Sequence, residues 1–160
     1  MKKIIFTLVM LLASVSWVSA QVQRVNFECN IHTVNKEEGQ WRKLWRLDDK
    51  DGGYVLIHKS AHPDEQVGRK GLLIIRDCFN MDEDEPKYWA FDLECPACAY
   101  KGIESEIKMV TNLVAECPTC RAEWQNVIHG SAGQTNRMGK YWLKAYRATL
   151  VGDIVRVRNY

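Results

Sequence analysis

Two short cysteine motifs constrain the fold of this chain more than any other feature of its sequence. The first is Cys95-Pro96-Ala97-Cys98 and the second is Cys117-Pro118-Thr119-Cys120, with 18 residues between them. Two CxxC pairs about 15 to 20 residues apart are typical of metal sites, because each tight turn directs two thiolates towards one point. The proline in each motif restricts φ and stiffens the turn. The sequence therefore predicts a metal site with four ligands: Cys95, Cys98, Cys117 and Cys120.

Two other interpretations of these four cysteines remain open from the sequence. They could form disulfides, either within each motif or between the two motifs. One motif could also be a thiol oxidoreductase centre, in which the reactive cysteine lies at a helix N-terminus that lowers its pKa. The residues after Cys98 show no 3.6-residue apolar period, so a redox centre carried on a helix is not expected.

The N-terminus has the pattern of a secretory signal peptide. Two lysines precede an apolar run at residues 4–18, and Val18 and Ala20 are acceptable to a signal peptidase at the cleavage point. We therefore expect residues 1–20 to be removed on export to the periplasm, the cell surface or the medium, leaving residues 21–160 as a single domain. A retained membrane anchor is the alternative, since roughly 17 to 25 apolar residues span a bilayer. No transmembrane segment is expected after cleavage.

The charge balance limits the kinds of partner that the mature chain would bind. The full chain has 22 basic and 20 acidic residues. Removal of the two N-terminal lysines with the signal peptide leaves 20 basic residues against 20 acidic ones. A net charge near zero argues against general nucleic-acid binding. An acidic cluster at residues 82–85 and a basic C-terminal stretch are interpreted as solvated surface, with docking of a charged partner as the alternative. The basic stretch contains Arg137, Lys140, Lys144, Arg147, Arg156 and Arg158.

Two cysteines, Cys29 and Cys78, lie outside the paired motifs, near or within predicted strands. Export implies an oxidising compartment, so we expect these two cysteines to form a disulfide. It would close a loop of about fifty residues and stabilise the fold by roughly 3 to 4 kcal/mol in the chain-entropy model. The alternative is two buried reduced thiols.

The rest of the chain has the pattern of an all-β protein. Short apolar, β-branched and aromatic segments alternate with Gly, Asp and Asn turn signals, which predicts a small antiparallel β-sandwich or barrel. Residues 51–53 and 151–153 have the composition of hairpin turns, and residues 60–71 and 130–139 are predicted loops. The predicted strands are residues 25–31, 41–47, 54–58, 72–78, 88–93, 107–110, 113–116, 124–128, 141–150 and 154–157.

The order of these features resembles a Rieske-type iron–sulfur domain of the exported kind. A strand at residues 88–92 leads into a first ligand loop at Cys95, and a second ligand loop at Cys117 leads into an aromatic strand at Trp124. A C-terminal hairpin then closes the domain. The resemblance covers about residues 40–158. It implies a small antiparallel β domain, a bound [2Fe-2S] cluster and electron exchange with a redox partner protein.

The ligand set departs from the Rieske pattern, which uses two cysteines and two histidines. Cys120 stands where the second histidine would be, Ala97 stands where the first would be, and Cys98 lies one residue further on. Four thiolates could hold a [2Fe-2S] cluster, a single iron or a single zinc. The CxxC spacing favours a single ion, whereas the resemblance favours the cluster. An iron-sulfur or iron centre is our expectation, and zinc is the alternative.

Two classes of function follow from this sequence. The first is an electron-transfer or redox module, with Trp89, Trp124 or Trp142 packed beside the metal. The second is a binding domain stapled by a structural zinc ion with four cysteine ligands. Paired carboxylates, a serine triad signature and a phosphate-binding loop are not visible in the sequence, so an enzyme acting on a small-molecule substrate is not expected.

Overall fold

The fold is that of an all-β protein, as the sequence predicts. The computed structural model describes residues 25–32, 47–48, 50–60, 62–80, 82, 85–128, 133–134 and 140–159. The predicted signal peptide, nearly all of the predicted strand at residues 41–47 and most of the predicted loop at residues 130–139 lie outside these ranges. In the described part, α2 (Pro96–Ala99) is the one helix in a chain of strands. None of the described helical structure has the length and hydrophobicity to cross a bilayer.

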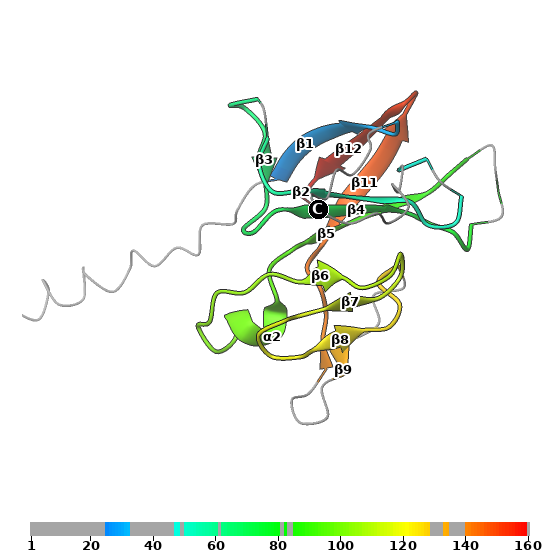
Figure 1. Cartoon of the computed structure of the whole chain (residues 1–160). Helices are drawn as coiled ribbons and strands as arrows, with labels where there is room; N and C mark the ends of the chain where they lie inside the picture. The colour runs from blue at the N-terminus through cyan, green and yellow to red at the C-terminus, as the bar shows by residue number, and fades with distance from the viewer. Residues whose placement is uncertain are drawn as a thin grey trace, which may run out of the picture.

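Seven strands form the larger of two antiparallel sheets (Figure 1). Their order across the sheet is β2-β4-β5-β11-β12-β1-β3, so the first and last strands that the structure describes pair with each other, β1 with β12. The strands are β1 (Val25–Asn30), β2 (Tyr54–Ile57), β3 (Gln66–Val67), β4 (Leu72–Arg76), β5 (Tyr88–Asp92), β11 (Ala145–Val151) and β12 (Ile154–Arg158).

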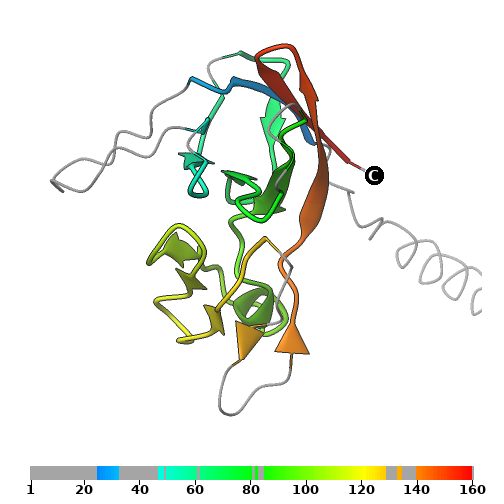
Figure 2. The same cartoon turned by 90° about the vertical axis from the view of Figure 1, so that its right-hand side faces the viewer.

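A smaller sheet is inserted between two neighbouring strands of the larger one. Its order is β10-β9-β8-β7-β6, and each of its strands has only two residues. Because β5 pairs with β11, the chain leaves the larger sheet and re-enters it at the same place. We call the described residues between 93 and 144 the small lobe; Figures 1 and 2 both show it beside the larger sheet. The strands are β6 (Lys108–Met109), β7 (Ala115–Glu116), β8 (Glu123–Trp124), β9 (Gly133–Gln134) and β10 (Lys140–Tyr141).

Strand β4 separates two hydrophobic cores, because its side chains alternate between the two faces of the sheet. Leu73 and Ile75 pack with the small lobe, including the motif cysteines. Leu72 and Ile74 pack on the opposite side with side chains of β1 and β12. All four are fully buried, which explains the continuous apolar run in the sequence of this strand. The larger sheet thus curls over one core and covers a second core that it shares with the small lobe.

Most of the predicted strands are present, although several are shorter than predicted. The hairpin turn at residues 151–153 joins β11 to β12, and Gly152 supplies the positive φ of 59° that the turn requires. The predicted strand at residues 141–150 is two strands, β10 and β11, which belong to different sheets. Strands β3 and β9 lie in stretches predicted as loops, and two-residue strands are too short to give a period in the sequence.

The expected disulfide between Cys29 and Cys78 is not present in the structure. Both residues are thiols, and they lie against different cores. Cys29 points inward from β1 into the core under β12, whereas Cys78 follows β4 and packs against the core shared with the small lobe. The sequence showed that both residues lie near strands but not which face of the sheet each one occupies.

Candidate metal centre

The structure brings together the four cysteines of the two motifs. Their Sγ atoms all lie within 4.8 Å of one another, an arrangement that could hold a metal ion. Between the two loops, Cys95 Sγ lies 3.6 Å from Cys120 Sγ and Cys98 Sγ lies 3.7 Å from Cys117 Sγ. We call Cys95, Cys98, Cys117 and Cys120 the cysteine cluster. The structure thus groups all of the metal ligands predicted from the sequence, although they come from separate loops.

The first ligand loop is a single helical turn. Cys95 follows β5 as the N-cap of α2, and Pro96 occupies the start of the helix, where its lack of an N–H costs no hydrogen bond. The turn closes with the N–H of Ala99 donating to the Cys95 carbonyl at 2.9 Å. A helix at this motif is not expected from the sequence, yet the structure has one helical turn here, with Cys95 at its N-cap. A turn of four residues is too short to show a 3.6-residue period in the sequence.

The second ligand loop is a hairpin turn between β7 and β8. The N–H of Cys117 donates to the Ala122 carbonyl at 2.8 Å, and the N–H of Arg121 donates to the Cys117 carbonyl at 2.8 Å. Arg121 has a φ of 59°, which is uncommon for a residue with a side chain and marks a tight reversal of the backbone. An ion pair of 2.8 Å joins Arg121 to Glu116 on the adjoining strand. This reversal turns Cys120 back towards Cys117.

The cysteine cluster is part of the hydrophobic core rather than of the surface. Cys95, Cys98 and Cys117 are at most 1% exposed, and only Cys120 is partly exposed. Trp124 packs in the same core and is fully buried. The site is therefore closed on most sides, which is the usual arrangement of a structural tetrathiolate site.

Hydrogen bonds and burial set the protonation of the thiols. Burial raises the pKa of Cys95, and it also raises the pKa of Cys98, to about 11. Burial has the same tendency at Cys117, but hydrogen bonds from Ser105 and from the backbone N–H groups of Cys120 and Thr119 outweigh it and lower the pKa to about 7. Metal binding requires four thiolates and releases the remaining protons. We therefore expect metal affinity to fall as the pH falls.

Replacing Ser105 with alanine should make metal binding more sensitive to acid. Ser105 Oγ lies 3.2 Å from Cys117 Sγ and 2.8 Å from Thr119 Oγ1, and its hydroxyl donates to the sulfur when Cys117 is a thiolate. Losing this hydrogen bond raises the pKa of Cys117. Because about four protons compete with the metal at acid pH, the pH at which half of the metal is released should rise by about 0.3 unit. Ser105→Thr keeps the hydroxyl and serves as the control. An unchanged release midpoint in Ser105→Ala would count against a role for this hydroxyl.

The sulfur positions fit a single ion. A tetrahedral ion with metal–sulfur bonds of about 2.3 Å has sulfur–sulfur edges of about 3.8 Å, close to the two distances between the loops. In a two-iron cluster each iron takes two of the thiolates, which places sulfurs on different irons roughly 5 Å or more apart. The 4.8 Å limit on all of the sulfur–sulfur distances is too short for that arrangement. Zinc and a single iron both fit the donor set, whereas the expected [2Fe-2S] cluster fits it poorly.

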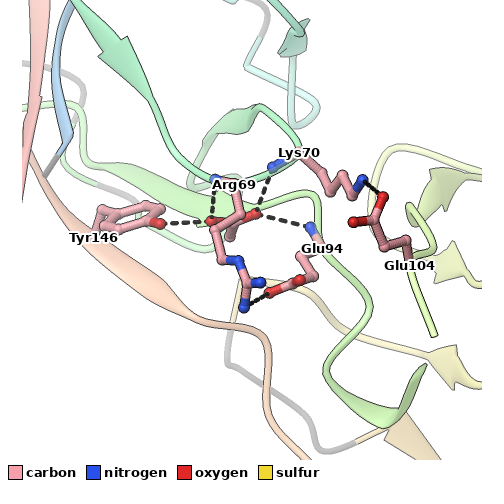
Figure 3. A network of polar contacts seen from close by, with 6 residues as sticks. Arg69, Lys70, Glu94, Glu104 and Tyr146 are labelled. Atoms are coloured by element: carbon pink, nitrogen blue, oxygen red, sulfur yellow. Dashed lines mark hydrogen bonds and ion pairs between the residues drawn. The ribbon is translucent and has the colours of Figure 1, made fainter. Parts of the chain in front are cut away.

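A buried carboxylate holds the strand that leads into the first ligand loop (Figure 3). Asp92 is 1% exposed and ends β5, three residues before Cys95. It accepts hydrogen bonds from the Tyr146 hydroxyl at 2.6 Å and from the backbone N–H groups of Arg69 at 3.0 Å and Glu94 at 2.8 Å. The backbone N–H of Lys70 donates a weaker hydrogen bond to Asp92, at 3.4 Å. These bonds join β5, β11 and the loop before β4 at the entrance to the small lobe.

Two ion pairs reinforce this junction. Arg69 lies 3.3 Å from Glu94, and Lys70 lies 2.6 Å from Glu104 (Figure 3). Both pairs connect the loop before β4 to residues that flank the first ligand loop. Each pair has one largely exposed partner, Arg69 in the first and Glu104 in the second, so water screens both attractions. The buried hydrogen bonds of Asp92 therefore contribute more to the junction than the ion pairs do.

Replacing Tyr146 with phenylalanine should destabilise the protein and change its response to alkaline pH. The substitution removes one donor to a buried carboxylate and should lower the free energy of unfolding at pH 7 by about 1 to 3 kcal/mol. Burial and the hydrogen bond to Asp92 raise the pKa of Tyr146 above its usual value of about 10. The folded state therefore favours the neutral phenol, and the stability that this provides is present below a pH of about 10 and lost as the pH rises above it.

Urea unfolding at pH 7 and at alkaline pH measures both effects. Tyr146→Phe should be less stable than wild type at pH 7, and the difference between the two should shrink at alkaline pH. Tyr100→Phe is the matched control, since Tyr100 is 80% exposed. Equal stabilities of wild type and Tyr146→Phe at pH 7 would show that Asp92 does not need this donor.

The three tryptophans that the sequence analysis placed beside the metal occupy different environments. Trp124 lies in the core with the cysteine cluster, and its Nε1–H donates to the Tyr141 carbonyl at 2.9 Å. Trp89 packs at the edge of this core and donates to Asp77 at 3.0 Å. Trp142 is 60% exposed. Ser105, which contacts Cys117, and Asp92, which holds the strand before the first ligand loop, could not be recognised from the sequence. Neither belongs to a motif, and both act through contacts between distant segments.

Comparison of the chain with protein-family models, with curated proteins and with solved structures found no significant match, so the assignment of the metal centre rests on the sequence and geometry of the chain itself.

Proposed function

We propose that this chain is an exported metal-binding protein, in which one ion bound by the cysteine cluster holds the small lobe in shape as part of a binding domain. One observation carries the proposal: the four sulfurs converge within the hydrophobic core of a lobe whose strands have only two residues each. Strands this short contribute few hydrogen bonds, so such a lobe needs another source of stability. A metal that crosslinks its two loops would supply it.

Zinc is the ion that best matches a structural role. It favours tetrahedral thiolate sites, and structural zinc sites have no open coordination position. Burial of Cys95, Cys98 and Cys117 leaves little room for a substrate or a water ligand beside the ion. The proposal thus adopts the binding-domain alternative of the sequence analysis.

Electron transfer through a single iron is the second candidate function. The observation that favours it is the partial exposure of Cys120, which would give a redox partner protein a short path to the ion. The resemblance to Rieske-type domains supports the same candidate, although a single tetrathiolate iron would replace the two-iron cluster. Four thiolates place more negative charge on the centre than a Rieske ligand set does, so its potential should lie below Rieske values.

Metal analysis of protein purified without added metal distinguishes these functions. Colourless protein with one equivalent of zinc, which loses the fold of the small lobe on chelation, supports the structural role. Coloured protein with one equivalent of iron, which bleaches when dithionite is added without air, supports electron transfer. Two irons with acid-labile sulfide would contradict a single-ion site. Export is tested separately, since the mature protein should begin at Gln21.

A further inference from the structure

Strand β11 changes partners along its length and leaves part of one edge unpaired. Its first two residues pair with β5, Ala145 with Phe91 and Tyr146 with Ala90. Continuing that register would pair Arg147 with Trp89, but the ladder ends, and β11 from Arg147 onward pairs only with β12 on its other edge. Figure 2 shows β11 running from the small lobe to the hairpin with β12. The edge of β11 that faces β5 therefore offers backbone groups to an incoming strand.

A groove lies where the ladder between β5 and β11 ends. It has a volume of about 710 Å³ and is lined by residues 85–89 on one side and by residues 146–150 and 152 on the other. Tyr146, Ala148 and Leu150 are the inward-facing residues of β11, and Ala148 and Leu150 remain only partly buried. The sheet is thus open between β5 and the later part of β11, and the side chains of Ala148 and Leu150 reach the groove there. None of these lining residues belongs to the small lobe.

The outward face of the same hairpin carries arginines at facing positions. Arg147 on β11 is directly opposite Arg158 on β12, and Arg156 lies opposite Thr149. Arg147, Arg156 and Arg158 line a hollow of about 360 Å³ that shares Arg147 and Thr149 with the groove. Arg156 is paired with Glu28 at 2.9 Å, whereas neither Arg147 nor Arg158 has an ion pair with any residue that the structure describes. Like charges at facing positions destabilise a sheet unless an anion lies between them.

We propose that an extended acidic segment of a partner protein binds in this groove as an added strand on β11. Successive side chains of a strand point to opposite faces, so the segment would alternate apolar and acidic residues. Its apolar side chains would pack on Ala148 and Leu150 and fill the groove, and its carboxylates would form ion pairs with Arg147 and Arg158. This binding site is separate from the proposed structural metal site, because the groove lies in the larger sheet and the metal site lies in the small lobe.

A peptide fits these observations better than another polyanion does. The open edge of β11 provides backbone donors and acceptors, and these are used fully only by another polypeptide backbone. The apolar floor would give a nucleic acid or a lipid headgroup no comparable contact. Glu85 and Lys87 also line the groove and offset each other, so the excess positive charge comes from the arginines of the hairpin.

The probe for this site is a fluorescein-labelled peptide of alternating glutamate and valine. Its control is a peptide of the same composition with the glutamates in one block and the valines in another. Fluorescence anisotropy should show that the alternating peptide binds at least about tenfold more tightly. Hydrogen exchange should show that it protects the amides of Ala148 and Leu150, which face away from β12, and electrostatic attraction alone would not do this.

Charge reversal tests the arginines directly. Arg147→Glu combined with Arg158→Glu should weaken binding of the alternating peptide by about tenfold or more. Lys101→Glu combined with Lys108→Glu reverses two exposed charges of the small lobe and should leave binding unchanged. Metal content and circular dichroism of each variant separate this result from any failure of the metal centre. Equal binding of the two peptides, unchanged exchange at Ala148 and Leu150, or tighter binding of single-stranded DNA or of anionic vesicles would overturn the proposal.

Discussion

Replacing Cys117 with serine is expected to abolish stoichiometric metal binding and to unfold the small lobe. Cys117 is fully buried and has the lowest pKa that the structure gives for this cluster, about 7, so it is the ligand most readily available to a metal ion near neutral pH. Structural zinc contributes an apparent ~10 to 16 kcal/mol to the folding of small domains. Losing even part of this is large beside a total stability of about 5 to 15 kcal/mol. We expect the free energy of unfolding to fall by at least about 3 kcal/mol.

Cys78→Ser is the matched control for this prediction. Cys78 is a partly buried cysteine outside the cysteine cluster, so its replacement should leave one equivalent of metal bound. Metal content by mass spectrometry of the native protein, together with urea unfolding, measures both variants. Serine at Cys95, Cys98 or Cys120 should behave like serine at Cys117. Full metal content in all four single variants would show that the cluster is not the metal site.

Replacing Trp124 with alanine is expected to be the most destabilising change outside the cysteines. The side chain is fully buried in the core that contains the cysteine cluster, and it donates a hydrogen bond to the Tyr141 carbonyl. Truncating a buried tryptophan to alanine typically costs about 3 to 5 kcal/mol, because a cavity remains. The unsatisfied carbonyl would add to this cost. The small lobe should loosen, and metal should then be released to a chelator more rapidly.

Trp142→Ala controls for the loss of an indole ring as such. Trp142 is 60% exposed, so its truncation should change the free energy of unfolding by about 0.5 kcal/mol or less. Urea unfolding and the rate of metal transfer to a chelator measure both variants. Equal stability of Trp124→Ala and Trp142→Ala would mean that the small lobe does not depend on the core around Trp124 and the cysteine cluster.

The metal ligands could be predicted from sequence because CxxC is a local constraint. A turn of four residues directs both of its thiolates towards one side, and the motif needs no tertiary information to do so. Strand β12 could be predicted for a similar reason, since Val155 and Val157 alternate with Arg156 and Arg158. In both cases the signal lies within a few consecutive residues.

Features that depend on how distant segments meet could not be predicted in the same way. The pairing of Cys29 with Cys78 failed because the face of the sheet that each residue occupies is set by tertiary packing. The choice between one ion and two irons depends on how closely the ligand loops approach, which is set by tertiary packing. The division of residues 141–150 into two strands, and the groove beside the second of them, arise where β11 leaves β5 for β12.

X-ray absorption spectroscopy at the edge of the bound metal gives the number of ions and the identity of their ligands. We expect Cys95, Cys98, Cys117 and Cys120 together to hold a single ion. The spectrum should then fit four sulfur neighbours at about 2.3 Å and should show no metal neighbour. Nitrogen or oxygen atoms among the metal's direct ligands, or a second metal atom close to the first, would contradict it.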